Sequence, residues 1–179
     1  PNYLTDDLVE EISSMEHVTS VSPLLETNAI FIQGKNTMDT QLIGAPRGYL
    51  EQMELGQGTL PPPDSQEMEL IYGNSVIQWF SDGKGGSSYW RTGELPDVDL
   101  MGRPMFVVFD TDAYRESQWG NSEQPVKTPK KYMIKTAGVV AGEVNDYNEY
   151  AYSVYTDLDL LKAQLKKIFR KNPIPGQPT

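Results

Sequence analysis

The sequence of 179 residues contains no cysteine and only one histidine, His17. The lack of cysteine excludes disulfide frameworks, thiolate zinc sites, iron–sulfur clusters and a cysteine nucleophile. A catalytic triad or a multi-histidine metal site would have to be built on His17. This residue stands between a helical pattern and a strand pattern and is better explained as a surface connector. We therefore expect no catalytic residues, no metal site and no cofactor.

Basic side chains are scarce in the first part of the chain. Residues 1–80 contain 2 basic and 12 acidic side chains, whereas residues 81–179 contain 13 of each, so the first part carries the whole net charge of −10. We expect no nucleic-acid partner, because phosphate binding draws most of its affinity from clustered lysine and arginine. A solvated acidic surface that keeps the domain soluble explains the excess better than the alternative, an acidic recognition patch.

Long hydrophobic runs are missing as well. No apolar stretch approaches the length of about 20 residues that a membrane-spanning helix needs. The opening letters PNYLTDDLVEE have neither the basic start nor the apolar stretch of a signal peptide. We interpret this start as a cut within a longer protein, so the localisation cannot be read from a targeting segment.

The patterns that are present predict an α+β fold with mixed, largely antiparallel sheets and short helices, because strands and helices alternate without a regular βα repeat. Helices are expected at 5–15, after Pro46, at 74–80, at 111–119 and after a cap at Asp157. Strands are expected in a hairpin at 28–46 that turns at 34–36, and at 67–73, 104–110, 131–140 and 148–155.

Glycine and proline gather between Gln57 and Gln66, where all regular structure is expected to break. We interpret this stretch as a boundary between two structural units. The boundary divides the chain into residues 1–60 and residues 61–179. A long loop with a short turn inside it is expected at 81–103.

No local motif in the sequence matches a known catalytic or ligand-binding pattern in full. The stretch SDGKGGSS at 81–88 lacks the spacing of a phosphate-binding loop and the strand-to-helix junction that such a loop needs, so we interpret it as a surface loop. Three acidic pairs resemble fragments of calcium ligand sets, but none continues into a full calcium-binding loop, and helix capping explains them better. They are Asp97 with Asp99, Asp110 with Asp112, and Asp157 with Asp159. Paired carboxylates for glycoside hydrolysis need only be close in space, so this alternative remains open.

Aromatic residues offer the best candidates for recognition. In the expected strand, alternation places Tyr150 and Tyr152 on one face and Tyr155 on the other, which is typical of packing. Trp90 and Trp119 fall in expected loops, which are more often free for binding. We take Trp90, Trp119 and Tyr147 as candidate recognition residues.

The order of the segments resembles that of a known family. The segments LTDDLVEEISSMEHVTSVSPLLE, AIFIQGKNTMDTQLIGAP, MELGQGTLPP, MELIYGNSVIQWF, VDLMGRPMFVVFD, KYMIKTAGVVAG and YSVYTDLDLLKAQLKKIF follow one another along most of the chain. Together they are similar to the MacB-like periplasmic core domain of FtsX/MacB-type ABC transporter permeases, in its Gram-positive version. The most family-like features are the V-x-x-V-S-P strand, Ile43–Gly44, Leu55 with Gly58, and the A-G-V strand at 137–139.

The resemblance implies a non-catalytic extracellular domain in two lobes, inserted between two transmembrane helices at the cell membrane. A cytoplasmic ATPase subunit or domain would be its partner through those helices, and a peptide, a lipoprotein or a small toxic compound its substrate. Residues 1–60 would form part of the membrane-proximal lobe, and residues 61–179 the distal mixed α/β insertion lobe and a return segment. A further strand and helix would follow residue 179 to complete that lobe. A surface-attached module that binds carbohydrate or peptide is the alternative, and a hydrolase is a third class.

Overall fold

The structure of the protein is a computed structural model that describes residues 23–119 and 127–169. The helix expected at 5–15 and His17 lie outside the described residues. Within the described part, strands and short helices alternate irregularly along the chain. In chain order they are β1 (Leu25–Gln33), β2 (Asn36–Ala45), α2 (Arg47–Leu50), β3 (Leu55–Gly58), β4 (Glu69–Tyr72), η1 (Val76–Trp79), α3 (Ser88–Thr92), β5 (Met105–Val108), α4 (Thr111–Trp119), β6 (Tyr132–Val140), β7 (Val154–Asp157) and α5 (Leu158–Ile168).

The seven strands form one mixed sheet in the order β3-β6-β4-β7-β2-β1-β5. An additional antiparallel pairing of β5 with β6 closes six of the strands into a ring. The seventh strand, β3, lies outside the ring and pairs with β6. Two of the pairings, β2 with β7 and β4 with β6, are parallel and the others are antiparallel. The predicted α+β class with a mixed, largely antiparallel sheet and short helices is confirmed.

The strands on both sides of residue 60 belong to this one sheet, since β1, β2 and β3 come before it and the other four come after. The assignment of residues 1–60 and 61–179 to two lobes stays a prediction.

The ring is filled by side chains that alternate along its strands. Phe31 of β1, Leu70 and Tyr72 of β4, and Val154 of β7 belong to the central core cluster. Their neighbours Ile30, Ile71 and Tyr155 point to the opposite face, where they join two further clusters. Both faces of these strands are therefore covered, which explains their nearly unbroken apolar runs.

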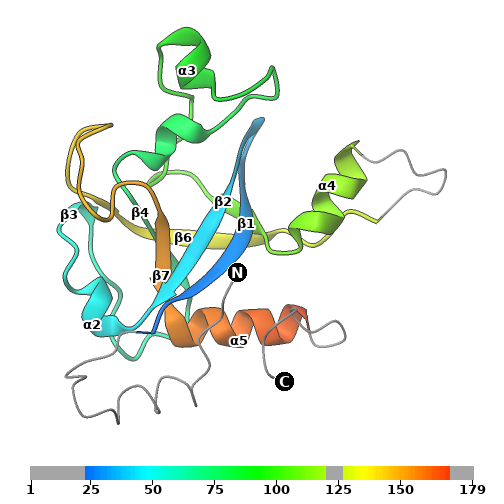
Figure 1. The fold of residues 1–179 in the computed structure, drawn as a ribbon. Coiled ribbons are helices and arrows are strands. Elements are labelled where there is room, and N and C mark those ends of the chain that lie inside the picture. Colours follow the sequence, from blue (N-terminus) through cyan, green and yellow to red (C-terminus); the bar gives the residue numbers. More distant parts are fainter. Residues whose placement is uncertain (1–22, 120–126, 170–179) are drawn as a thin grey trace, which may run out of the picture.

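Short helices cover the openings and faces of the ring. Leu158, Leu161 and Leu165 of α5 form an apolar stripe and join the central cluster. The Asp157 carboxylate accepts a hydrogen bond from the Leu160 N–H at 3.0 Å, which confirms the predicted cap. In Figure 1, α5 lies below the sheet, and α3 lies beyond the opposite end.

The β1–β2 hairpin has the predicted turn. Gln33 pairs with Asn36, so the connecting loop is Gly34–Lys35. Gly34 has a φ of 59°, and glycine at the first loop position is typical of a type II′ hairpin turn.

Two element boundaries differ from the prediction. The stretch expected to break all regular structure begins with β3, which pairs with β6 across a β-bulge. At Gly58, with a φ of 77°, a Cβ atom would lie 1.9 Å from the Ala137 carbonyl oxygen, so only glycine allows this close approach. The strand expected from residue 148 begins only at Val154, because the Asn148 side chain accepts the Tyr150 N–H at 2.8 Å and forms a turn.

Candidate functional site: a rigid projection and an acidic groove

The candidate recognition residues lie in three separate places. Trp90 belongs to α3 and is 72% exposed, and Tyr147 lies in the loop before β7 and is 85% exposed. Trp119 is the last residue of α4. Both tryptophans thus lie on short helices, Trp90 within the loop expected at 81–103 and Trp119 at the end of the helix expected at 111–119. The structure assigns no contact between Trp90 and Tyr147 within the described residues, and their role in recognition stays a prediction.

The tyrosines of the expected strand pack, as the sequence predicted, but not on the predicted faces, because only Tyr155 lies on β7 and Tyr150 joins it in one cluster. Tyr150 and Tyr155 are buried, and their rings contact each other and Tyr49 at centroid distances between 5.7 and 6.2 Å. Tyr152 stacks on Trp79 at 5.6 Å. Burial raises the pKa of Tyr155 to about 12, so this phenol stays neutral near pH 7.

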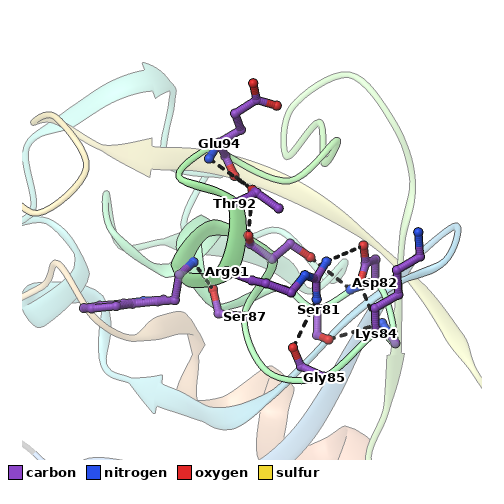
Figure 2. A network of polar contacts seen from close by, with 11 residues as sticks. Ser81, Asp82, Lys84, Gly85, Ser87, Arg91, Thr92 and Glu94 are labelled. Carbon is purple, nitrogen blue, oxygen red and sulfur yellow. Dashed lines mark hydrogen bonds and ion pairs between the residues drawn. The ribbon is translucent and has the colours of Figure 1, made fainter.

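Residues 81–93 form a projection at the end of the sheet, and Figure 2 shows the polar contacts that hold it. Ser81 is fixed to β2 by two backbone hydrogen bonds with Thr37, of 2.9 and 2.8 Å. Arg91 donates to the Asp82 carboxylate at 2.8 Å and to the Gly85 carbonyl at 3.1 Å. Together these contacts fix the loop that the sequence predicted to be a plain surface loop.

A helix cap completes the projection. The Ser87 hydroxyl accepts the Trp90 N–H at 3.3 Å and donates to the Gln78 carbonyl, so the cap ties α3 to η1. Gly93 has a φ of 79° and ends the helix in the left-handed conformation. The exposed Trp90 ring is thus carried by an ordered turn of helix.

The Asp82 carboxylate is stabilised in its charged form. It accepts the Lys84 N–H at 3.0 Å, and this bond, together with the Arg91 guanidinium, lowers the pKa of Asp82 below its usual value. The ion pair with Arg91 is therefore fully charged near pH 7. It supports the projection rather than any chemistry.

A groove of about 480 Å³ lies between residues 95–103 and the loop 142–144. Its volume falls within the range of about 300–1,000 Å³ that is typical of ligand sites. The lining consists of Gln57, Asn74, Ile77, Leu95, Pro96, Asp97, Val98, Asp99, Leu100, Met101, Arg103, Val139, Gly142, Glu143 and Val144. We call this site the acidic groove.

The first wall of the groove is tied to the β1–β2 hairpin. The Gln33 amide donates to the carbonyls of Asp99 and Arg103 at 2.9 and 3.2 Å, and it accepts the Asp99 N–H at 2.7 Å. Asn36 donates to the Asp97 carbonyl at 3.2 Å. Val98 and Leu100 of the same segment are buried in the central core. This wall is therefore preformed.

The second wall is organised by one buried side chain, Asn74, which is only 5% exposed. Its amide nitrogen donates to the carbonyls of Glu143 and Asp146, both at 2.9 Å, and its oxygen accepts from Asn148 at 2.9 Å. The Asn145 N–H donates to the Ser75 hydroxyl at 2.8 Å. The loop that carries Glu143 is thus fixed by hydrogen bonds to the buried Asn74 and to Ser75.

The sequence did not single out this groove. Its two walls are separated by about forty residues along the chain, and their side chains carry no spacing motif. The acidic pair Asp97 and Asp99 was noted, and we expected capping. Neither caps a helix, since Asp99 accepts the Gly102 N–H at 2.8 Å within a turn and the Asp97 carboxylate pairs with Arg103 at 2.9 Å.

Among the described residues, no group of three or more histidine, cysteine or acidic side chains could hold a metal ion. No helix in the described ranges is both long and apolar enough to cross a membrane.

No family model and no curated protein matches the chain. The extracellular domain of the noncanonic ABC-type transporter YknZ from Gram-positive bacteria matches with a TM-score of 0.46 and 11% identity. The periplasmic region of MacB from Actinobacillus actinomycetemcomitans matches with a TM-score of 0.43 and 15% identity. Each match covers 89% of this chain, but 65% of the YknZ chain and 56% of the MacB chain.

At these values the likeness concerns the arrangement of the chain and assigns no activity. The structural resemblance that the order of the segments implied is found. The chain is similar in structure to the extracellular or periplasmic domains of MacB and YknZ.

Proposed function

We propose that this chain is an extracellular domain of an ABC transporter permease subunit. It would take no part in catalysis and would couple ATP hydrolysis in the cytoplasm to the export or sensing of a peptide, a lipoprotein or a small toxic compound. The observation that carries the proposal is the order of sequence segments, from V-x-x-V-S-P to the last helix, which resembles the MacB-like core domain.

The positions of the first and last described elements, β1 and α5, support this proposal. Leu25 at the start of β1 pairs with Gly44 of β2. A Cβ atom at Gly44 would lie only 3.2 Å from the Cα atom of Leu158, so the first turn of α5 packs against the same part of the sheet. Both ends of the described fold therefore lie on the side of α5 (Figure 1). A domain inserted between two membrane helices needs this arrangement.

The construction of the sheet also suits a mechanical role. A ring of six strands has a continuous backbone network and a filled core, so force applied on the side of α5 would reach the projection at 81–93 with little deformation. The partner that supplies the force would be a cytoplasmic ATPase, linked through the membrane helices of the whole protein. The division into a membrane-proximal lobe at 1–60 and a distal lobe is part of this proposal.

The exposure of Trp90 and Tyr147 favours the alternative, a surface-attached module that binds carbohydrate or peptide. Exposed aromatic rings are common binding anchors. The two functions differ in what surrounds the domain, since a permease has several membrane helices and an ATPase partner.

Cysteine labelling tests the proposed location directly, because these 179 residues contain no cysteine and any cysteine elsewhere in the full-length protein can first be replaced by serine. Tyr147→Cys is introduced into the full-length protein in intact cells, and a membrane-impermeant maleimide is added. Labelling is expected from the outside, while Val107→Cys, whose side chain is fully buried, should react only after denaturation. Protection of Cys at position 147 until the cells are lysed would overturn the extracellular location. Co-purification of the full-length protein with an ATPase separates the permease from the attached module.

A further inference from the structure

We infer that the acidic groove binds a peptide segment that carries lysine or arginine beside large aliphatic side chains. This inference deepens the proposed function by naming a ligand class, and as a route to transport or sensing it rests on that function. Binding itself depends only on the groove.

The charges of the groove favour a cation. Its lining contains three carboxylates, from Asp97, Asp99 and Glu143, and one guanidinium, from Arg103. Arg103 already pairs with Asp97 at 2.9 Å. Among the described residues, no lysine or arginine pairs with Asp99 or Glu143. Two negative charges are thus left for a ligand, and the net charge of −10 would attract a cation over longer distances.

The apolar part of the lining favours aliphatic side chains. Leu95 and Met101 are 47% and 39% exposed, although both are large and apolar. They lie beside Ile77, Val139 and Val144 in the same lining. The unbranched methionine side chain adapts to differently shaped apolar partners. A ligand that covers these groups gains the free energy of their removal from water.

The lining also favours a peptide over a sugar as the ligand. None of the described residues that line the groove is aromatic, whereas sugars are usually held by stacking on aromatic rings. Gln57 of the groove belongs to β3, which ends the strand order and, within residues 23–119 and 127–169, pairs with β6 alone. Its second edge leaves backbone groups that an extended peptide can pair with. A peptide therefore matches the groove in charge, in apolar surface and in backbone chemistry.

Fluorescence anisotropy with a labelled peptide of alternating leucine and lysine tests the inference on the whole 179-residue chain. Saturable binding is expected, and it should weaken as salt is raised, because salt screens exposed charges. The same peptide with glutamate in place of lysine, and one with serine in place of leucine, should both bind more weakly. A maltooligosaccharide serves as the competing ligand class and should not displace the peptide.

Matched variants locate the site. Glu143→Lys should weaken binding by about tenfold, and Glu143→Gln by about threefold, in line with exposed ion pairs. Glu116→Lys makes the same charge change at an exposed position of α4, outside the groove, and should change binding by less than about twofold. Met101→Ser should weaken binding by about fivefold, whereas Met133→Ser, at a 64% exposed position on β6, should leave it unchanged.

Three results would overturn the inference: no saturable binding, equal losses in the Glu143→Lys and Glu116→Lys variants, or displacement by the sugar. Circular dichroism confirms that each variant is folded, and Met101→Ser tests the site should Glu143→Lys fail to fold. These outcomes are independent of the labelling of the full-length protein. If the groove binds the peptide but the full-length protein has no membrane helices, only the permease proposal is refuted. If the full-length protein is a permease but the groove binds no peptide, only this inference is refuted.

Discussion

Replacement of Asn74 by alanine should lower the free energy of unfolding by about 2–3 kcal/mol. The change removes three short hydrogen bonds, to the carbonyls of Glu143 and Asp146 and from the Asn148 amide. Each buried hydrogen bond contributes about 1 kcal/mol net. The two carbonyls lose their donor but regain part of it from water at the loop surface, which keeps the loss near the sum of the three bonds.

Asn36→Ala is the matched control. Asn36 is as buried as Asn74, at 5% exposure, but makes one side-chain hydrogen bond, to the Asp97 carbonyl at 3.2 Å. The same chemical change should therefore lower the free energy of unfolding by only about 1 kcal/mol. In a domain of this size, the expected difference between the variants corresponds to roughly 2–8 °C in melting temperature.

Urea unfolding followed by tryptophan fluorescence measures both variants, with an unchanged m-value as the sign that the folded state is otherwise intact. Hydrogen exchange at residues 143–148 should accelerate in Asn74→Ala and stay unchanged in Asn36→Ala. Equal losses of stability in the two variants would refute the view that Asn74 holds the second wall of the groove. The peptide affinity of Asn74→Ala should fall with the order of that wall.

Three further predictions concern the scaffold. Gly73→Ala should destabilise the fold by more than about 3 kcal/mol in urea unfolding, because a Cβ atom there would lie 2.3 Å from the carbonyl oxygens of Tyr150 and Ala151. Gly48→Ala, with open space around it, should change stability by less than about 1 kcal/mol, and equal effects of the two variants would contradict this packing. Asp157→Ala should lower the free energy of unfolding by about 1 kcal/mol through loss of the α5 cap, and Asp157→Asn should restore most of it; an unchanged midpoint would show that the cap contributes nothing. Burial raises the pKa of Tyr155 to about 12 from an unfolded value of about 10, so the contribution of this phenol to the free energy of unfolding is fully present below pH 10 and is lost as the pH rises toward 12. Tyr155→Phe should flatten this loss in unfolding curves taken from about pH 9 to 12, and parallel curves for the two proteins would disprove the assignment.

Local interactions determined those elements that the sequence predicted correctly. The hairpin depends on one glycine in its turn, and α5 depends on the Asp157 cap and an apolar stripe with helical spacing. Strands β5 and β6 are runs of four and nine residues, rich in apolar side chains, and their type is decided within a few residues. Each of these signals lies inside the segment that it governs, so the sequence alone reveals it.

Long-range pairing decided the rest. Strand β3 forms because Gly58 allows the chain to approach β6, about eighty residues later, and the expected strand at 148 is shortened by a turn that Asn148 and the distant Asn74 build together. The acidic groove exists only because Gln33 and Asn74 each fix a segment more than sixty residues away. Such contacts bring together residues whose separation along the chain carries no signal, so only the tertiary structure places Leu95, Met101 and Glu143 around one cavity.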